Sequence, residues 1–243
     1  MAITHISSAN GAANGFDGTT TTTATLPGTI AADDLIIVAV HTTDGVITIA
    51  TPTDNKGGNT YTPVAAQFDA DIGHSRVWYS KVVNGGTNFQ VTVTNAQTGY
   101  GDIIVHQISG QDLSAPLDKV VNNNQAAPGT GTDAITSTAQ TPTTDGQYIF
   151  GFTLQDDFVI STISAGTGFT AGETSGPSDF PGRSEYVVQG AAASIAATFT
   201  HSVDVETITW LVTFKPVGGR TTKNTTSHPL GLELGQRRGI GGV

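Results

Sequence analysis

The sequence predicts an all-β protein: an antiparallel, jelly-roll-like β-sandwich of two pseudo-repeated halves, followed by an extended C-terminal tail. Three observations predict this class. Segments of strand length, either apolar or alternating, follow one another and are separated by turn residues. No stretch of ten or more residues shows helical periodicity. The segments of residues 34–110 recur in the same order in residues 145–215, at offsets that fall from about 112 to 105 residues, and such a spacing is too long for a solenoid or propeller repeat.

The first half begins with two weak strand signals and then a strong one. Ile3–Ser7 predicts a short strand. The threonine-rich run Thr19–Thr25 predicts an edge strand, because β-branched threonine fits a pleated surface. Leu35–His41 is almost continuously apolar, which indicates a strand covered on both faces.

A hairpin is expected later in the first half. Val77–Val83 and Phe89–Thr94 flank Asn84-Gly85-Gly86, which is typical of a tight turn with positive φ. Apolar and polar residues alternate strictly in Phe89–Thr94, so this strand should have one buried face.

The stretch Gln111–Thr144 connects the two halves. It contains three prolines and three consecutive asparagines, and it predicts a crossing connection with at most one strand, around Ala134–Thr138. The second half then repeats the elements of the first, with a long insertion at Gly172–Gly182.

Four pairs of segments carry the internal repeat. They match Asp34–Val40 with Gly146–Phe152, Thr60–Thr62 with Gly168–Thr170, Trp78–Thr94 with Glu185–Thr200, and Ile103–Ser109 with Ile208–Phe214. Aromatic residues recur at matching places, Tyr61 with Phe169 and Tyr79 with Tyr186, and we interpret them as core residues.

Composition fits a scaffold. The chain has 243 residues, no cysteine and only 12% charged residues, so disulfides and thiolate metal sites are excluded, and residues 1–215 are expected to form one large sandwich. Up to Lys215 there are 19 acidic and six basic residues, and from Pro216 onward one acidic and four basic, giving −13 and +3. An acidic body disfavours nucleic acid and anionic membranes as partners.

The histidines and carboxylates show no strong catalytic or metal-binding pattern. The six histidines form no short-spaced pair; His41 and His106 end two apolar strands, where neighbouring positions with ordinary hydrogen bonds are expected and a paired metal or switch role is the alternative. Asp69 and Asp71 could offer oxygens to calcium but lack the further acids of a loop site. Asp156-Asp157 should point to opposite faces of a strand.

No serine lies in a nucleophile-elbow context. We therefore predict no catalytic residues, no metal, no cofactor and no enzymatic activity. For a binding surface, the aromatic residues in or beside loops are the candidates: Tyr100, Phe158 and Phe180.

Several short motifs, taken in order, resemble a known module. They are Asp34–Val40, Asp54-Asn55 with Gly58–Thr62, Trp78–Gly86, Ile108–Gly110, Ala115–Asp118 and Val212–Lys215. Together they resemble the duplicated β-sandwich modules of phage virion structural proteins and of bacterial surface proteins with unassigned function. The resemblance covers roughly residues 3–215 and departs at Lys56-Gly57 and at Ile108. It implies a sandwich fold, and it is poorly specific for function.

Residues 216–243 form the predicted tail. Seven glycines and two prolines prevent a core of its own. Alternating leucines followed by two arginines could add a strand to a neighbouring sheet, and we assign them to subunit docking: Leu230, Leu232, Leu234, Arg237 and Arg238. The alternative is a disordered terminus or a cloning remnant.

The function expected from these features is that of a phage virion structural protein, namely a capsid decoration, tail or fibre subunit. It would assemble through sheet faces and extended termini with copies of itself or other virion proteins. The N-terminal residues lack the pattern of a signal peptide, so we expect synthesis in the host cytoplasm and location in the virion. The alternative is a carbohydrate-binding or adhesive module that recognises a cell-surface glycan.

Overall fold

The computed structural model describes residues 2–11, 15–43, 48–127, 129, 131, 133–155, 161–175 and 181–218. Within these residues the chain forms sixteen strands and no helix. The strands are β1 Thr4–Asn10, β2 Thr19–Ile30, β3 Leu35–Thr43, β4 Thr53–Asp54, β5 Thr62–Pro63, β6 Phe68–Ala70, β7 Gly73–Lys81, β8 Gly86–Ser109, β9 Leu117–Gln125, β10 Asp133–Thr136, β11 Tyr148–Gln155, β12 Ile163–Ala165, β13 Thr170–Ser175, β14 Gly182–Val188, β15 Thr198–His201 and β16 Thr207–Phe214.

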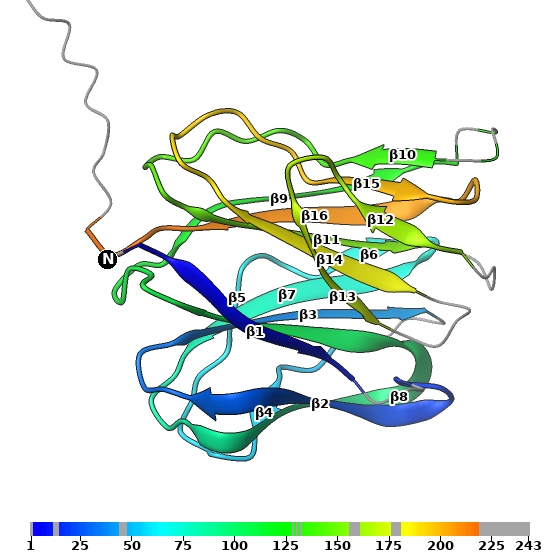
Figure 1. The fold of residues 1–243 in the computed structure, drawn as a ribbon. Coiled ribbons are helices and arrows are strands. Elements are labelled where there is room, and N and C mark those ends of the chain that lie inside the picture. Colours follow the sequence, from blue (N-terminus) through cyan, green and yellow to red (C-terminus); the bar gives the residue numbers. More distant parts are fainter. Residues whose placement is uncertain are drawn as a thin grey trace, which may run out of the picture.

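The strands form four stacked layers (Figure 1). Outer sheet 1 contains β2, β4 and the first part of β8. Inner sheet 1 contains β1, β3, β5, β6, β7 and the last part of β8. Inner sheet 2 contains β9, β11, β13, β14 and β16, and outer sheet 2 contains β10, β12 and β15. Every strand pairing is antiparallel, so the predicted all-β antiparallel class is confirmed, whereas the jelly-roll description stays a prediction.

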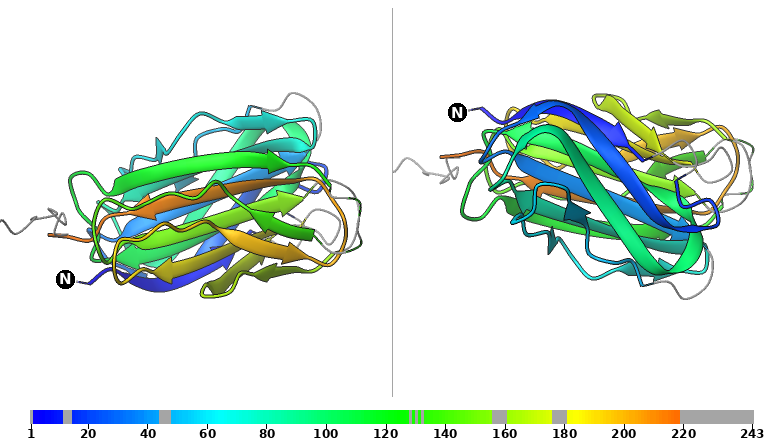
Figure 2. Two further views of the ribbon diagram at one scale, coloured as in Figure 1. Left: turned by 90° about the horizontal axis from the view of Figure 1, so that it is seen from above. Right: turned by 90° about the horizontal axis from the view of Figure 1, so that it is seen from below.

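Three apolar cores lie between these four layers. The central core joins the two inner sheets and includes Ile37, Phe150 and Trp210. A second core lies between inner and outer sheet 1, around Trp78 and Phe89. A smaller third core fills the space between inner and outer sheet 2. Each outer sheet lies over part of its inner sheet when the molecule is seen from above and below (Figure 2), so each half is a sandwich and the halves pack back to back.

The two inner sheets have matching strand orders, β1-β8-β3-β7-β5 and β9-β16-β11-β14-β13. The residue-level match differs from the predicted one. Ile37 lies opposite His106 and faces the central core, and the residue with that place in the second half is Phe150, opposite Val212. The predicted match instead gives Ile149, which faces the third core.

The predicted match of Asp34–Val40 with Gly146–Phe152 is therefore wrong by one residue. The predicted match of Ile103–Ser109 with Ile208–Phe214 has the same error. It does not align Ile104 with Trp210, although both residues face the central core at corresponding places. A shift of one residue moves every side chain of a strand to the opposite face. A common origin of the halves stays a prediction, and the matching strand orders agree with it.

The central strand β3 behaves as its apolar sequence predicts. Leu35, Ile37 and Ala39 face the central core, while Ile36 and Val38 face the second core. The predicted alternation in Phe89–Thr94 is confirmed too, since its apolar residues are fully buried in the second core.

The predicted hairpin around Asn84-Gly85-Gly86 is wrong. β7 pairs with β3 in inner sheet 1, whereas the start of β8 pairs with β2 in outer sheet 1. The connection crosses from one layer to the other, because apolar side chains of the two strands face each other across the second core. Gly86 has the expected positive φ of 127°. Gly85 is needed for another reason: a Cβ there would lie 2.1 Å from the Ile30 carbonyl oxygen.

The connection Gln111–Thr144 contains two strands, β9 and β10, rather than one at most. β9 includes the three asparagines and pairs with β16 at the edge of inner sheet 2. Tertiary contacts overcome the low strand propensity of asparagine there; for example, Asn123 Nδ2 donates to the Thr136 carbonyl at 3.1 Å.

The described chain ends at Gly218, at the end of the molecule where the N-terminus also lies (Figure 1). Pro216 forms an antiparallel bridge with Gln111, and the Val217 amide donates to the Gly110 carbonyl at 2.8 Å. The body therefore holds the first two residues that the sequence assigns to the tail. Gly218 has a φ of 65°.

Candidate docking site

The two buried histidines of the first half bond to residues of the second half. His106 Nδ1 lies 3.0 Å from the Tyr148 hydroxyl, and its Nε2 lies 2.8 Å from Ser184 Oγ. His41 Nε2 lies 3.1 Å from Ser175 Oγ. Burial lowers the pKa of both histidines, that of His41 to about 3. Both rings are thus neutral at physiological pH and bridge the two inner sheets.

The predicted neighbouring of these histidines is wrong, although their ordinary hydrogen bonds are confirmed. His41 is paired across the strands with Asp102, and His106 with Ile37, so they lie at different positions along the β3–β8 pair. Among the described residues, no group of three or more His, Asp or Glu side chains could hold a metal ion.

Two carboxylates, Asp69 and Glu185, have structural partners. Asp69 accepts a hydrogen bond from Gln67 Nε2 and pairs with His74 Nδ1, both at 2.6 Å, while Asp71 is exposed in the following turn. Glu185 accepts from the backbone amides of Gly166 and Thr198, both at 2.8 Å. Burial raises the pKa of Glu185 to about 7, against these two hydrogen bonds, and the side chain fastens inner sheet 2 to outer sheet 2.

A polar cluster lies at the end of the third core. His201 is fully buried, and neither of its ring nitrogens has a hydrogen-bond partner among the described residues. Its cross-strand partner Asp133 has a raised pKa, first through burial and then through the charge of Asp204. No carboxylate among the described residues bonds the imidazole of His201.

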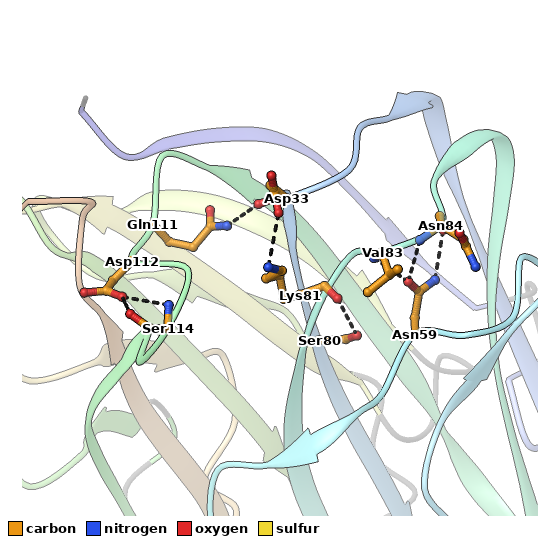
Figure 3. A network of polar contacts seen from close by, with 9 residues as sticks. All are labelled: Asp33, Asn59, Ser80, Lys81, Val83, Asn84, Gln111, Asp112 and Ser114. Atoms are coloured by element: carbon orange, nitrogen blue, oxygen red, sulfur yellow. Dashed lines mark hydrogen bonds and ion pairs between the residues drawn. The ribbon is translucent and has the colours of Figure 1, made fainter.

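The motif residues in the connecting loops of the first half bond to one another. Asp54 accepts from the amides of Lys56 and Gly57, both at 2.9 Å, and from the Tyr61 hydroxyl at 3.2 Å. Asn59 Oδ1 accepts from the amides of Val83 and Asn84 (Figure 3). These polar side chains fasten two loops together, which is a structural role.

The motif Ala115–Asp118, at the boundary between the two halves, is also held by hydrogen bonds to a carboxylate. Asp118 accepts from the Thr143 amide, the Thr143 hydroxyl and Gln147 Nε2, each at 2.7 Å. Asp112 lies just before this motif and caps the turn that follows it. Its Oδ1 accepts from the Ser114 amide, the Ser114 hydroxyl (Figure 3) and the Ala115 amide. These hydrogen bonds lower the pKa of Asp112, the Ala115 and Ser114 amides having the largest effect.

A pocket lies where the first half ends and the described chain leaves the body. Its volume is about 280 Å³, and its walls are Ala32, Asp33, Asp34, Ser109, Gly110, Gln111, Leu113 and Val217. Leu113 and Val217 are 44% and 41% exposed, two of five large apolar side chains that are exposed in the described chain. An exposed apolar surface with a polar rim is typical of an interaction site.

The polar groups of this pocket are arranged around Gln111. Its Nε2 donates to the Asp33 carbonyl, and Asp33 Oδ1 lies 3.3 Å from Lys81 Nζ (Figure 3). Gln111 is only 1% exposed, and its Oε1 has no hydrogen-bond partner among the described residues. A buried acceptor without a partner is costly, so an N–H group that reached this atom after a shift of the surrounding side chains would be favoured there.

The predicted site residues fall mainly outside the described chain. Phe158, Phe180, Asp156-Asp157 and the docking residues of the tail all lie there. Tyr100 lies on β8, is half-buried and takes part in an interaction of its own. Sequence reasoning missed the pocket residues Gln111, Leu113 and Val217. The only signal in the sequence was their position, at the start of the predicted connection Gln111–Thr144 and at the start of the predicted tail.

Comparison with family models, with curated proteins and with solved structures finds no match for this chain. No helix among the described residues is long and apolar enough to cross a membrane. The candidate site therefore rests on geometry alone.

Proposed function

We propose that the protein is a structural subunit of a phage virion, namely a capsid decoration, tail or fibre subunit that is made in the host cytoplasm. It assembles with copies of itself or with other virion proteins through its sheet faces and its termini. The resemblance of its ordered motifs to phage virion modules supports this proposal, and a four-layered all-β body agrees with the role of a scaffold.

One observation carries the proposal: a tail of net charge +3 leaves a body of net charge −13 directly beside an exposed apolar pocket. Opposite charges on tail and body favour contact between subunits.

The test is assembly. The full chain and a chain truncated after Gly218 are compared by analytical ultracentrifugation and by incorporation into particles. Truncation after Gly218 keeps the pairing of Pro216 and Val217 with the body. We expect the truncated chain to lose oligomers or incorporation. A strictly monomeric full chain whose incorporation does not depend on the tail would contradict the proposal.

The second candidate function is glycan binding in an adhesive module. A hollow of about 470 Å³ on outer sheet 2 favours it, because threonine hydroxyls line much of it: Thr136, Thr167, Thr198 and Thr200. This volume falls within the roughly 300–1,000 Å³ of small-ligand sites. Binding to a glycan array that Thr198→Val abolishes and that Tyr100→Ala leaves intact would favour this function and locate it here.

A further inference from the structure

The pocket beside Gln111 lies next to the point where the tail begins. Val217 forms part of its wall, and Gly218 follows as the last described residue. Residues 219–229 then connect Gly218 to Leu230, the first leucine of the tail. The tail of one copy therefore starts at the rim of its own pocket, close to any second copy that contacts this end.

We propose that this pocket is the receptor for the Leu230–Leu234 segment of a second copy of the chain. The inference rests on the proposed function, in which the tail docks on a neighbouring subunit, and adds the acceptor site and the atoms that receive the tail. One leucine side chain enters between Leu113 and Val217. The leucines alternate with Gly231 and Glu233, as they must if an extended segment is to point them to one side.

The walls of the pocket fit a side chain with an adjoining peptide group. The volume of the pocket, about 280 Å³, is slightly smaller than that of the usual site for a drug-sized ligand. The Leu113 and Val217 side chains supply apolar surface. Gln111 Oε1 is a buried acceptor without a partner among the described residues, and a backbone N–H of an extended tail would satisfy it once the pocket walls shift to expose this atom.

The orientation of the Gln111 amide is fixed by its neighbour. Nε2 must face the Asp33 carbonyl, because an amide oxygen there would oppose another acceptor. Oε1 consequently points to the other side of the side chain (Figure 3). An exchange of the oxygen and nitrogen positions in the Gln111 amide therefore does not explain why Oε1 has no partner.

Charge favours the tail as occupant. The pocket walls include two carboxylates, Asp33 and Asp34, and none of its eight lining residues is basic. Lys81 pairs with Asp33 alone. Asp34 is buried and accepts from the Ala31 amide and from Gln107 Nε2, so the attraction comes from the body as a whole. The tail carries Arg237 and Arg238 just beyond the leucines, and the net charge of −13 on the body favours their approach.

Reciprocal exchange follows from the position of the pocket. When the donor segment and the acceptor pocket lie at the same end of one chain, two copies related by a twofold axis can exchange tails. Both pockets are then filled by identical contacts, and the assembly closes.

The direct test places a photo-crosslinking benzoylphenylalanine at position 113 of the full chain. Natural-abundance and ¹⁵N-labelled copies are mixed, irradiated and digested. We expect cross-links from position 113 to the Leu230–Leu234 segment that join one light and one heavy peptide. Cross-links only between peptides of the same isotope, or to other segments only, would overturn the proposal.

Variants of the full chain give an independent measurement. Leu113→Asp and the pocket-filling Ala32→Leu should each weaken self-association by about tenfold or more, the loss expected when one leucine side chain is no longer buried. Val83→Asp is the matched control, since Val83 is 58% exposed at the same end of the molecule; it should leave association unchanged. Urea unfolding of each variant verifies that the fold is retained.

The combined variant Leu230→Asp, Leu232→Asp and Leu234→Asp separates the two proposals. Loss of association in this variant with normal association of Leu113→Asp and Ala32→Leu overturns the pocket and leaves tail docking intact. Normal association of the triple variant overturns the pocket as the tail's receptor, and a wild type that is monomeric at every concentration overturns self-assembly as well.

Discussion

At the scale of single residues, hydrogen bonds that backbone amides donate to side-chain oxygens fasten the loops of this protein more than ion pairs do. Asp54 and Asn59 hold the loops of the first half, and Asp118 holds the boundary between the halves. Two ion pairs join described residues to one another, and one of them requires a protonated histidine. A chain with few charges uses carboxylates as acceptors for backbone amides, which are strong charge-assisted hydrogen bonds.

Asp54→Ala should lower the free energy of unfolding by about 1–3 kcal/mol, because it leaves several donors without their acceptor. Tyr61 is among these donors; burial, and next the charge and hydrogen bond of Asp54, raise its pKa, so the hydroxyl stays protonated. Urea denaturation measures the loss. The control Asp71→Ala changes an exposed residue and should stay within about 0.5 kcal/mol of the wild type; equal losses in both variants would contradict the assigned role.

The free energy of unfolding should decrease as the pH is lowered below 6.5. Burial holds the pKa of His41 at about 3 in the folded protein, so the unfolded chain binds the proton first. Between pH 6.5 and 3, His41 removes about 1.4 kcal/mol of unfolding free energy per pH unit. Glu185 has the opposite sign: its raised pKa of about 7 contributes stability below pH 4.5, and this is lost as the pH rises through 7.

His41→Gln tests the sign for one group. Glutamine can replace the Nε2 contact with Ser175 but does not titrate. We expect a shallower loss of stability between pH 6.5 and 4.5 in denaturation curves of this variant. An unchanged slope would show that His41 is not the titrating group.

At the scale of elements, the long strand β8 belongs to two layers. Its first part pairs with β2 in outer sheet 1 and its last part with β3 in inner sheet 1. The second half achieves the same arrangement with two strands, β15 and β16. The connection from β7 into β8 must therefore pass close to the end of β2, and Gly85 allows this approach.

Gly85→Ala should destabilise the protein by about 1–3 kcal/mol, because backbone atoms of Ile30 would have to move away from the added methyl group. A Cβ at Gly190 meets no atom within 4 Å, and its φ is not in the positive range, so Gly190→Ala should cause no loss. Thermal unfolding compares the two. Similar melting temperatures would contradict the close approach.

At the scale of the whole molecule, the central core makes the two halves depend on each other. Phe150, Trp210 and Ile37 pack there between the inner sheets. Polar contacts reinforce the same interface: Trp210 Nε1 donates to Ser75 Oγ at 2.8 Å, and Ser8 Oγ donates to Glu173 at 2.6 Å. Neither half could expose this inner face to water without losing its largest apolar surface.

The halves should therefore unfold together. The chain has two tryptophans, Trp78 in the second core and Trp210 in the central core. In Trp210→Phe and Trp78→Phe, the remaining tryptophan reports on one core. Fluorescence and circular dichroism should give coincident urea transitions in each variant. Separate transitions would show that the halves are independent folding units.

The sequence predicted the strong strands well and the connections poorly. Leu35–His41 and Phe89–Thr94 were recognisable because apolar runs and strict alternation follow from what each face contacts. β9 was missed since its asparagines are bonded by neighbours that are distant in the chain. The candidate pocket was missed because it joins residues 32–34, 109–113 and 217, none of which forms a motif alone.

By itself, the sequence determined the all-β class, the buried strands and a tail opposite in charge to the body, because these depend on local composition and on period-two patterns. Only the tertiary structure decided that the halves pack back to back in four layers, which residue of one half matches which of the other, and where the pocket lies. The physical reason is that a strand's pattern states how many of its faces are buried, whereas register and layer order depend on the partner that each face meets.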